Sequence, residues 1–300
     1  MIKYKINNLL ERFGYSPISK KETRKNMHYH IPNWEYQKKV IEPLLKEGDL
    51  VIDIGSGHNP SPRANILSDF FPDDPIHRGS KLVEDRPTII CSLEKLPFQP
   101  KSIDFAICSH VFEHLENPKF AASELAAVAK AGYIETPAYG KDILVGTGNI
   151  HLWQVVSFNN EMHFFQYTER QHQAHTLAPI MQYWGQESYH PWQPFFSERQ
   201  DLFNASHVWK DHPNIFEHRF NASTRTEKPW EPIKLEVLPS TQVQLTEKEI
   251  ILLEACLATP DRKEKMTYKD GRFVNSDETI IYPVRGKRVY VEIPDDFIPH

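Results

Sequence analysis

The chain has 300 residues, of which 40% are hydrophobic and 25% charged, a composition typical of globular rather than disordered proteins. Its formal net charge of -5 gives no overall attraction to polyanions, so bulk nucleic-acid binding is disfavoured. The three cysteines, Cys91, Cys108 and Cys256, are widely spaced and odd in number, which predicts neither a disulfide framework nor a cysteine metal site. Neither a signal-peptide pattern nor an apolar run of about 18 residues occurs, so we expect a cytoplasmic protein without a membrane span.

The chain opens with a basic N-terminal arm, residues 1–33, for which a solvated helix is the simplest interpretation. Apolar residues then recur at helical spacing over 34–45, and Gly48 follows at a helix-stop position. The apolar run at 49–54 leads directly into Gly-Ser-Gly at 55–57. This order predicts a buried parallel strand that ends in a tight turn.

Further strands and one helix come next at short intervals. Runs with the apolar character of buried strands lie at 64–67, 88–91, 104–108 and 132–136. An alanine-rich helix is expected over 119–130, with Gly132 as its stop signal. Strands that alternate with crossover helices predict an α/β protein with a parallel, doubly wound sheet. Pro60 and Pro62 oppose a full first crossover helix.

The second half of the chain changes character. Periodicity weakens after residue 140, and histidines and aromatic residues accumulate, which predicts a cap or large insertion. A helix over 246–257 is followed by runs that alternate like hairpin strands. We therefore expect four parts: an N-terminal arm (1–33), a Rossmann-like core (34–140), an aromatic-rich cap (141–245) and a small β-rich C-terminal module (246–300).

The turn at 55–57 predicts a cofactor site, because glycines let a ligand approach the backbone while free N–H groups face the crevice. It does not fit a dinucleotide fingerprint, since Pro60 occupies the third glycine position. A phosphate-binding loop is also excluded, because no Gly-Lys-Ser/Thr comes after it.

Four segments in order resemble the successive motifs of class I S-adenosylmethionine-dependent methyltransferases of type 11. They are Val-Ile-Asp-Ile-Gly-Ser-Gly (51–57), Cys-Ser-Leu-Glu-Lys-Leu-Pro-Phe (91–98), the run 101–114 and Gly-Tyr-Ile-Glu-Thr-Pro (132–137). The resemblance covers about residues 34–140 and implies a seven-stranded Rossmann-like sheet that binds S-adenosylmethionine. The cofactor contacts that it implies are Asp53, Gly55, Ser56, Gly57, Asp69, Ser92, Leu93, Ser109 and His110.

Two positions depart from the family pattern or stay open. Ser92 stands where the family usually has an acidic residue, so the adenine-side contact would come from a hydroxyl or a backbone amide. Asp69 is the preferred ribose carboxylate because it follows a strand-like run. The alternatives for that role are Asp73, Asp74, Glu84 and Asp85.

Methyl transfer to a hydroxyl needs alignment and a base. The candidate bases are His151, His110, His114, Glu113 and Glu135. We rank His151 first, because it follows the fifth strand, where the family resemblance places the acceptor. Glu113 and His114 equally suit a capping or packing role.

Two histidine patterns raise the question of a metal. His110-x-x-Glu113-His114 matches the inverted zincin motif, but it begins at a strand end within the methyltransferase order. His172 and His175 also have ligand spacing, although an exposed helix face explains them more simply. We therefore expect no metal.

The aromatic residues of the cap offer flat faces for stacking, although a core role is the simpler interpretation. They include Trp153, Trp184, Trp192, Trp209, Tyr167, Tyr183, Phe195 and Phe196. We expect some of them to line an acceptor pocket, since this superfamily builds that pocket after the fifth strand.

The C-terminal segments 252–257, 268–274 and 280–289 resemble the small zinc-ribbon-like activator subunit of tRNA and protein methyltransferases. Only Cys256 stands near the metal end of that subunit, so zinc is not expected there. The resemblance implies a module that stabilises the enzyme or gates its acceptor, and a plain structural extension is equally open.

The acceptor is inferred from the segment directly after the fourth strand. Base and amide methyltransferases usually carry Asn/Asp-Pro-Pro-Tyr there, whereas this chain has Ser-His-Val-Phe at 109–112. The segment 9–15 also resembles the openings of glycan methyltransferases. We therefore expect O-methylation of a small molecule or glycan, with an RNA or protein methyltransferase, or a non-catalytic scaffold of the same fold, as alternatives. The sequence does not fix the oligomeric state.

Overall fold

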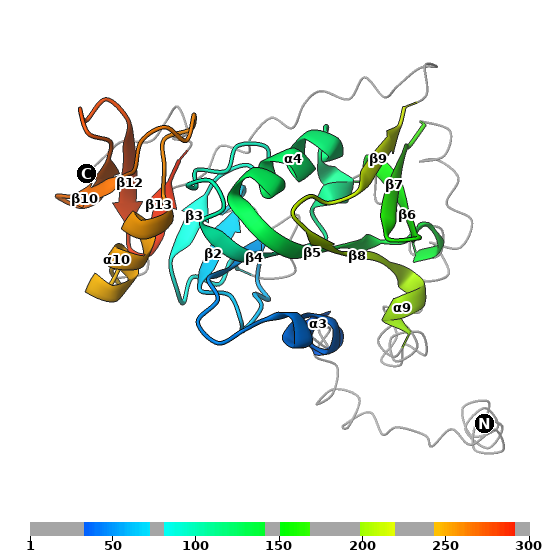
Figure 1. Ribbon diagram of the computed structural model, residues 1–300. Helices are drawn as coiled ribbons and strands as arrows, with labels where there is room; N and C mark the ends of the chain where they lie inside the picture. The colour runs from blue at the N-terminus through cyan, green and yellow to red at the C-terminus, as the bar shows by residue number, and fades with distance from the viewer. Residues whose placement is uncertain (1–32, 73–80, 142–150, 169–198, 220–242, 292–300) are drawn as a thin grey trace, which may run out of the picture.

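The computed structural model describes residues 33–72, 81–141, 151–168, 199–219 and 243–291 (Figure 1). The predictions for the N-terminal arm, for the His172 and His175 pair, and for Trp184, Trp192, Tyr183, Phe195 and Phe196 lie outside these residues. The described elements are α3 (Asn33–Ile41), the 3-10 helix η1 (Glu42–Leu44), β1 (Val51–Ile54), β2 (Ile66–Asp69), β3 (Thr88–Ile90), β4 (Ile103–Ser109), the 3-10 helix η2 (Phe112–His114), α4 (Pro118–Val128), β5 (Ala129–Pro137), β6 (Trp153–Phe158), β7 (Glu161–Gln166), α9 (Gln200–Phe203), β8 (Asn204–Lys210), β9 (Ile215–His218), α10 (Glu247–Cys256), β10 (Thr267–Lys269), β11 (Arg272–Val274), β12 (Ile281–Arg285) and β13 (Arg288–Tyr290).

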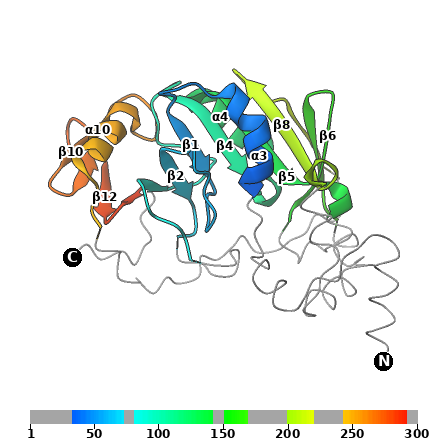
Figure 2. The same cartoon turned by 90° about the horizontal axis from the view of Figure 1, so that it is seen from below.

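The main sheet has ten strands in the order β10-β11-β12-β13-β3-β2-β1-β4-β5-β8. Strands β3, β2, β1, β4 and β5 are parallel, and β8 runs antiparallel to β5. Helix α3 lies on one face of the sheet and α4 on the other (Figures 1 and 2). The fold is thus mixed α/β and Rossmann-like. Among the described residues, the part of the sheet from β3 to β8 has six strands rather than the seven expected, and the C-terminal module adds four more beyond β3.

The central strands form because their residues are apolar on both faces. All four residues of β1 and of β2 are buried. The larger core cluster includes residues of α4 and of the C-terminal module. A smaller one gathers Ile41, Val51, Phe105, Ile107 and Tyr133, which joins α3 to the sheet. The five strands predicted over 49–136 are all present, with boundaries shifted by a few residues.

Gly132 corrects one prediction, because it lies inside β5 rather than at a helix end. Helix α4 ends at Val128, and the chain continues directly into the strand. A Cβ atom at Gly132 would lie 2.4 Å from the carbonyl oxygen of Ala106 and 2.7 Å from Cζ2 of Trp209. The glycine is therefore required by close packing and is not a helix stop.

Among the described residues, the expectation of crossover helices holds only for α4. This helix joins β4 to β5. The chain from β1 to β2 returns through turns, without a helix. Pro60 and Pro62 lie in this segment, where a helix interior would tolerate neither. None of the described helices has both the length and the apolar character needed to cross a membrane.

The described part of the predicted cap is more regular than expected. Strands β6, β7 and β9 form a three-stranded sheet, and β8 completes the edge of the main sheet. Trp153, Tyr167 and Trp209 are buried, so these three aromatic side chains pack in the interior and do not line an open acceptor pocket. Arg219 lies over the Trp153 ring, 4.9 Å from its centroid.

The C-terminal module is tied to the rest of the sheet by main-chain and ionic contacts. Strand β13 pairs in parallel with β3, and the carbonyl of Lys287 accepts a hydrogen bond from the N–H of Thr88. The Lys287 side chain also pairs with Glu249 of α10 at 2.7 Å. Helix α10 begins in a capping box between Thr246 and Glu249, as the Thr-x-x-Glu pattern favours.

Candidate active site

The residues predicted to contact the cofactor lie at the carboxyl ends of the parallel strands of the main sheet. Asp53 lies in β1, Asp69 ends β2, Ser92 and Leu93 follow β3, and Ser109 ends β4. These strands are parallel, so their carboxyl ends lie on the same side, where open α/β sheets bind ligands. The geometry therefore brings together segments that are separated by up to 56 positions in the chain.

The glycine turn after β1 uses its backbone differently from the prediction. Gly55 and Gly57 have φ values of 70° and 55°, which favour glycine. The N–H groups of Gly55 and Ser56 both donate to the carbonyl of Ser68, at 2.8 and 3.1 Å. Both N–H groups are thus hydrogen-bonded to β2 and are not free to bind a ligand in the crevice, because the turn packs directly against the neighbouring strand.

Gly55 also needs its missing side chain. A Cβ atom there would lie 2.2 Å from Cγ2 of Val111, in the turn after β4. The turns that follow β1 and β4 are therefore in direct contact. Ser56, the next residue of the β1 turn, is buried, and its hydroxyl makes no hydrogen bond with the described residues.

Asp53 is a buried carboxylate, 5% exposed, that organises the return from the glycine turn. Its Oδ2 atom accepts a hydrogen bond from the N–H of Ser61 at 2.6 Å. Burial raises the pKa of Asp53 to about 7, against the lowering effects of the Ser61 N–H and of Arg86, and nearby Asp69 adds to the rise. Asp53 can therefore change its protonation state near neutral pH.

Asp69 stands at the end of β2 with its carboxylate fixed by two backbone donors. Gly57 N–H donates to Oδ2 at 3.2 Å and Phe71 N–H to Oδ1 at 2.9 Å. Of the alternatives for the ribose contact, Glu84 is paired with Arg288 and Asp85 with Arg86, while Asp73 and Asp74 lie outside the described residues. These pairings leave Asp69 the best placed of the described carboxylates.

Three imidazoles surround one buried carboxylate next to this loop, and we call His110, Glu113, His114 and His151 the histidine cluster. The distance from Glu113 Oε1 is 3.5 Å to Nδ1 of His110 and 3.7 Å to Nε2 of His114. The rings of His114 and His151 meet edge to face, with centroids 5.0 Å apart. The structure thus gathers all three histidines that the sequence analysis named as candidate bases.

The position of His151 depends on two hydrogen bonds made by its neighbours. Leu152 N–H donates to the carbonyl of Glu113 at 2.7 Å, and Trp153 Nε1 donates to the carbonyl of Leu115 at 2.6 Å. These bonds fix the start of β6 against η2. They bring His151 beside a turn that lies 38 positions earlier in the sequence.

Glu113 is 1% exposed, and neither carboxylate oxygen forms a hydrogen bond with the described residues. Burial raises the pKa of Glu113, but contact with His110 and the charges of His114 and His151 outweigh this effect and bring the pKa down to about 2. The cluster therefore presents a buried negative charge whose neighbours are imidazole nitrogens.

Glu135 has a different environment, although it too was a candidate base. Its Oε2 accepts from the hydroxyl of Tyr133 at 2.6 Å, and its Oε1 accepts from Gln37 and Ser109, each at 3.2 Å. Nε2 of His110 lies 3.6 Å from Oε1. The carboxylate is fully buried among donors, which suits a group that positions His110. The sequence analysis missed Gln37 and Tyr133, because nothing in their local pattern points to this site.

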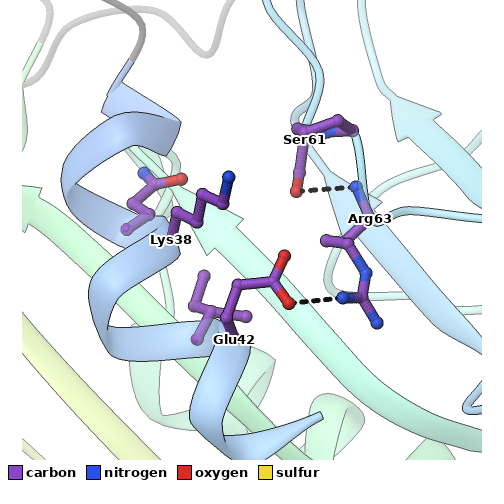
Figure 3. Close-up of a pocket in the computed structure, with 7 residues that line it drawn as sticks. Lys38, Glu42, Ser61 and Arg63 are labelled. Carbon is purple, nitrogen blue, oxygen red and sulfur yellow. Dashed lines mark hydrogen bonds and ion pairs between the residues drawn. The ribbon is translucent and has the colours of Figure 1, made fainter. Parts of the chain in front are cut away.

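A small hollow lies between α3 with η1 and the segment 61–63, whose Ser61 N–H donates to Asp53 (Figure 3). Glu42 of η1 forms an ion pair with Arg63, and the N–H of Arg63 donates to the hydroxyl of Ser61 at 3.4 Å. Lys38 extends from the helix toward Ser61. This arrangement supports the loop that holds Asp53 and is separate from the histidine cluster.

Residues 73–134 match the methyltransferase domain family. The match identifies part of a methyltransferase domain and supports S-adenosylmethionine as the cofactor. The match includes β3, β4, η2 and α4, and therefore contains three of the four cluster residues. No curated protein matches the chain.

Several solved structures resemble part of the chain. The [4+2]-cyclase SpnF is 17% identical with a TM-score of 0.28, over 35% of this chain and 45% of that one. The YcgJ protein of Bacillus subtilis is 19% identical with a TM-score of 0.32, over 41% of this chain and 62% of that one. A complex of the Haloferax volcanii Trm112 methyltransferase activator with a methyltransferase is 17% identical with a TM-score of 0.32, and the match covers 41% of this chain and 70% of that one. The chain thus spans less than half of the first of these proteins, and likenesses this distant say nothing about its substrate.

The residues present fit S-adenosylmethionine. Ser56 has a buried hydroxyl without a hydrogen bond to the described residues, and Asp69 presents a fixed carboxylate at the end of β2. Such a carboxylate suits the diol of a ribose. The residues predicted to hold the cofactor therefore lie next to the histidine cluster, through the close approach of Gly55 to Val111.

Proposed function

We propose that this methyltransferase domain transfers a methyl group to an oxygen of a small molecule or glycan. The observation that carries the proposal is the histidine cluster, which packs through Val111 against the Gly55 turn of the cofactor site. A hydroxyl acceptor must lose its proton during transfer, and imidazole is the side chain best suited to take it near neutral pH.

His110 is the best-supported base in this arrangement. Its two ring nitrogens lie 3.5 Å from Glu113 and 3.6 Å from Glu135, so carboxylates flank the ring and orient it. Its φ of 58° is unusual for a residue other than glycine and fixes the ring at the end of β4. His151, ranked first from the sequence, and His114 complete the set of imidazoles that we propose to face the acceptor.

S-adenosylmethionine, when bound, supplies an electrophilic methyl group. The residues of the chain have the remaining tasks in our proposal. The ends of β1 to β4 hold the cofactor, Asp69 its ribose, and Ser92 with Leu93 its adenine side. Glu135 positions His110, and the imidazole of His110 takes the acceptor proton.

We also propose that the C-terminal module stabilises the adenine side of the cofactor site. Strand β13 pairs with β3 directly before Ser92, and β3 would otherwise be an edge strand. The N–H of Ala258 donates to the carbonyl of Pro97, and that of Gln99 to the carbonyl of Cys256. Cys256 itself is buried with its thiol directed at the Leu253 carbonyl, which supports a packing role.

The test has two steps. Calorimetry with S-adenosylmethionine and S-adenosylhomocysteine measures cofactor binding, which Asp53→Ala should abolish. Transfer of an isotope-labelled methyl group to small-molecule and glycan fractions then measures activity. Both His110→Ala and His151→Ala should reduce it, and His151→Ala should do so without loss of cofactor binding.

Controls and contrary outcomes are specific. His163→Ala changes an imidazole of β7 outside the site and should leave both readings unchanged. Labelled RNA or protein in place of a small product would replace our acceptor class with the alternative one. Cofactor binding with no labelled product from any fraction would favour the non-catalytic scaffold, and absence of cofactor binding would refute the whole proposal.

A further inference from the structure

Glu113, His114 and His151 bring three metal-ligating side chains to one point. One ligand atom from each lies within 4.8 Å of the other two, and this is the single such group among the described residues. Glu113 is buried, whereas both histidines are partly exposed. The group therefore combines a buried anchor with two ligands that an ion can reach from solvent.

The Glu113 carboxylate is an independent indication that something binds here. It is 1% exposed, its oxygens form no hydrogen bond with the described residues, and its Oε1 atom lies 3.5 and 3.7 Å from imidazole nitrogens of His110 and His114. A buried polar group without a hydrogen bond is costly, and more so when it is charged. A cation bound to the carboxylate would remove that cost.

The donor set identifies the kind of cation. Two imidazole nitrogens and one carboxylate oxygen are the protein ligands of catalytic zinc sites of the His2Glu type, which leave a further position open. Ligand atoms around a tetrahedral zinc are about 3.4 Å apart, given bond lengths of roughly 2.1 Å. The 3.7 Å between Glu113 and His114 is already close to this value, and all three ligand atoms lie within 4.8 Å of one another, so side-chain movements would draw them together around an ion. Magnesium fits poorly, because it prefers oxygen ligands.

We propose that Glu113, His114 and His151 form a binding site for zinc or a similar divalent transition-metal ion. The expectation of no metal rested on a sequence motif that offered His110 and His114 as the ligands. The folded chain supplies a different set, because His110 turns toward Glu135 and His151 arrives from the start of β6.

The ion would also favour acceptors that carry a hydroxyl group, an inference that rests on the proposed function. An acceptor hydroxyl bound at the open position of the ion would be more acidic than a free one.

Metal binding can be tested without cofactor or acceptor, so its failure is distinct from failure of the proposed function. The chelator-treated full chain is titrated with Zn²⁺ by calorimetry and with Co²⁺ by visible absorption, which reports coordination number. We expect one ion per chain and a Co²⁺ spectrum of four- or five-coordinate type. Mg²⁺ should not compete at equal concentration.

Variants locate the site. Glu113→Gln and His151→Ala should each weaken Zn²⁺ binding beyond the roughly 10–100-fold that changes to outer-shell groups cause. His163→Ala is the matched control, because His163 also contacts a glutamate and a second histidine, Glu161 at 3.2 Å and His218 at 3.0 Å. Its Zn²⁺ affinity should equal that of the unaltered chain.

Three results would overturn the proposal: no stoichiometric Zn²⁺ binding, equal binding by His151→Ala and the unaltered chain, or loss of binding in His163→Ala alone. Circular dichroism of each variant shows whether it is folded. If Glu113→Gln does not fold, His151→Ala decides the question, since His151 is partly exposed and its replacement leaves no buried charge.

Discussion

Replacing Asp53 by asparagine should change how the stability of the protein depends on pH. The carboxylate is buried in β1 and accepts one hydrogen bond from the Ser61 N–H, which an asparagine oxygen can also accept. Burial, partly offset by that N–H and by Arg86, raises its pKa from 3.8 to about 7. At 1.36 kcal/mol per pKa unit, keeping Asp53 ionised in the folded state costs about 4 kcal/mol.

The raised pKa of Asp53 decides in which direction stability changes with pH. Between pH 3.8 and 7 the folded state holds a proton that the unfolded state has lost. The stability due to this proton is complete below pH 3.8 and disappears as the pH rises through 7. From pH 5 to 8 the unaltered chain should therefore lose about 3 kcal/mol relative to Asp53→Asn.

Urea unfolding at constant ionic strength, followed by tryptophan fluorescence from pH 5 to 8, measures this difference. Asp104→Asn is the control. Partial burial raises the pKa of Asp104, but contacts with Lys130 and the Leu50 N–H outweigh it, and the pKa is lowered overall. Its difference from the unaltered chain should therefore stay constant over this range. A constant difference for Asp53→Asn as well would refute the reasoning about buried charge at the cofactor loop.

Three further predictions concern the cofactor site and the module. Gly55→Ala should abolish S-adenosylmethionine binding in calorimetry, because its Cβ meets Val111, whereas Gly271→Ala has a similar φ of 80° with open space and should retain it. Tyr282→Phe should lower the free energy of unfolding by about 1–3 kcal/mol in urea titrations, since it leaves the buried carbonyl of Ala258 without its 2.9 Å hydrogen bond. Binding of the cationic cofactor beside Asp53 should release protons near pH 6, because Asp53 is then mostly protonated in the free protein. Calorimetry in buffers of different ionisation enthalpy measures this release, and a binding enthalpy that does not depend on the buffer would show that Asp53 is already ionised.

The parallel core could be predicted from sequence because its signals are local. Each central strand is a short apolar run, and such runs bury both faces of a parallel sheet. Gly132 shows where local signals mislead. A glycine after an alanine-rich segment is typical of a helix end, but here it admits Trp209, which lies 77 positions later. The packing partner determines the role of the glycine, and the sequence around it carries no trace of that partner.

The edges of the sheet were less predictable for the same reason. The module was expected from its hairpin pattern, but the parallel pairing of β13 with β3 joins residues about 200 positions apart. Strand β8 was assigned to an irregular cap because its residues, Asn204 to Lys210, do not form a continuous apolar run. It is a strand because β5 offers it a complete row of backbone partners.

The candidate site combines both situations. Asp53, Asp69, Ser92 and Ser109 lie in or directly after predictable strands, so parallel pairing alone brings them to one edge. The histidine cluster depends instead on the hydrogen bond between Leu152 and Glu113, which no periodicity encodes. That bond changes the meaning of the His110-x-x-Glu113-His114 motif. On a regular helix, residues 110 and 114 would share one face, whereas here residue 110 has a φ of 58° and only residues 112–114 form a 3-10 turn. The two histidines therefore separate, His110 toward Glu135 and His114 toward His151, and a single motif provides one candidate base, His110, and two candidate metal ligands, Glu113 and His114.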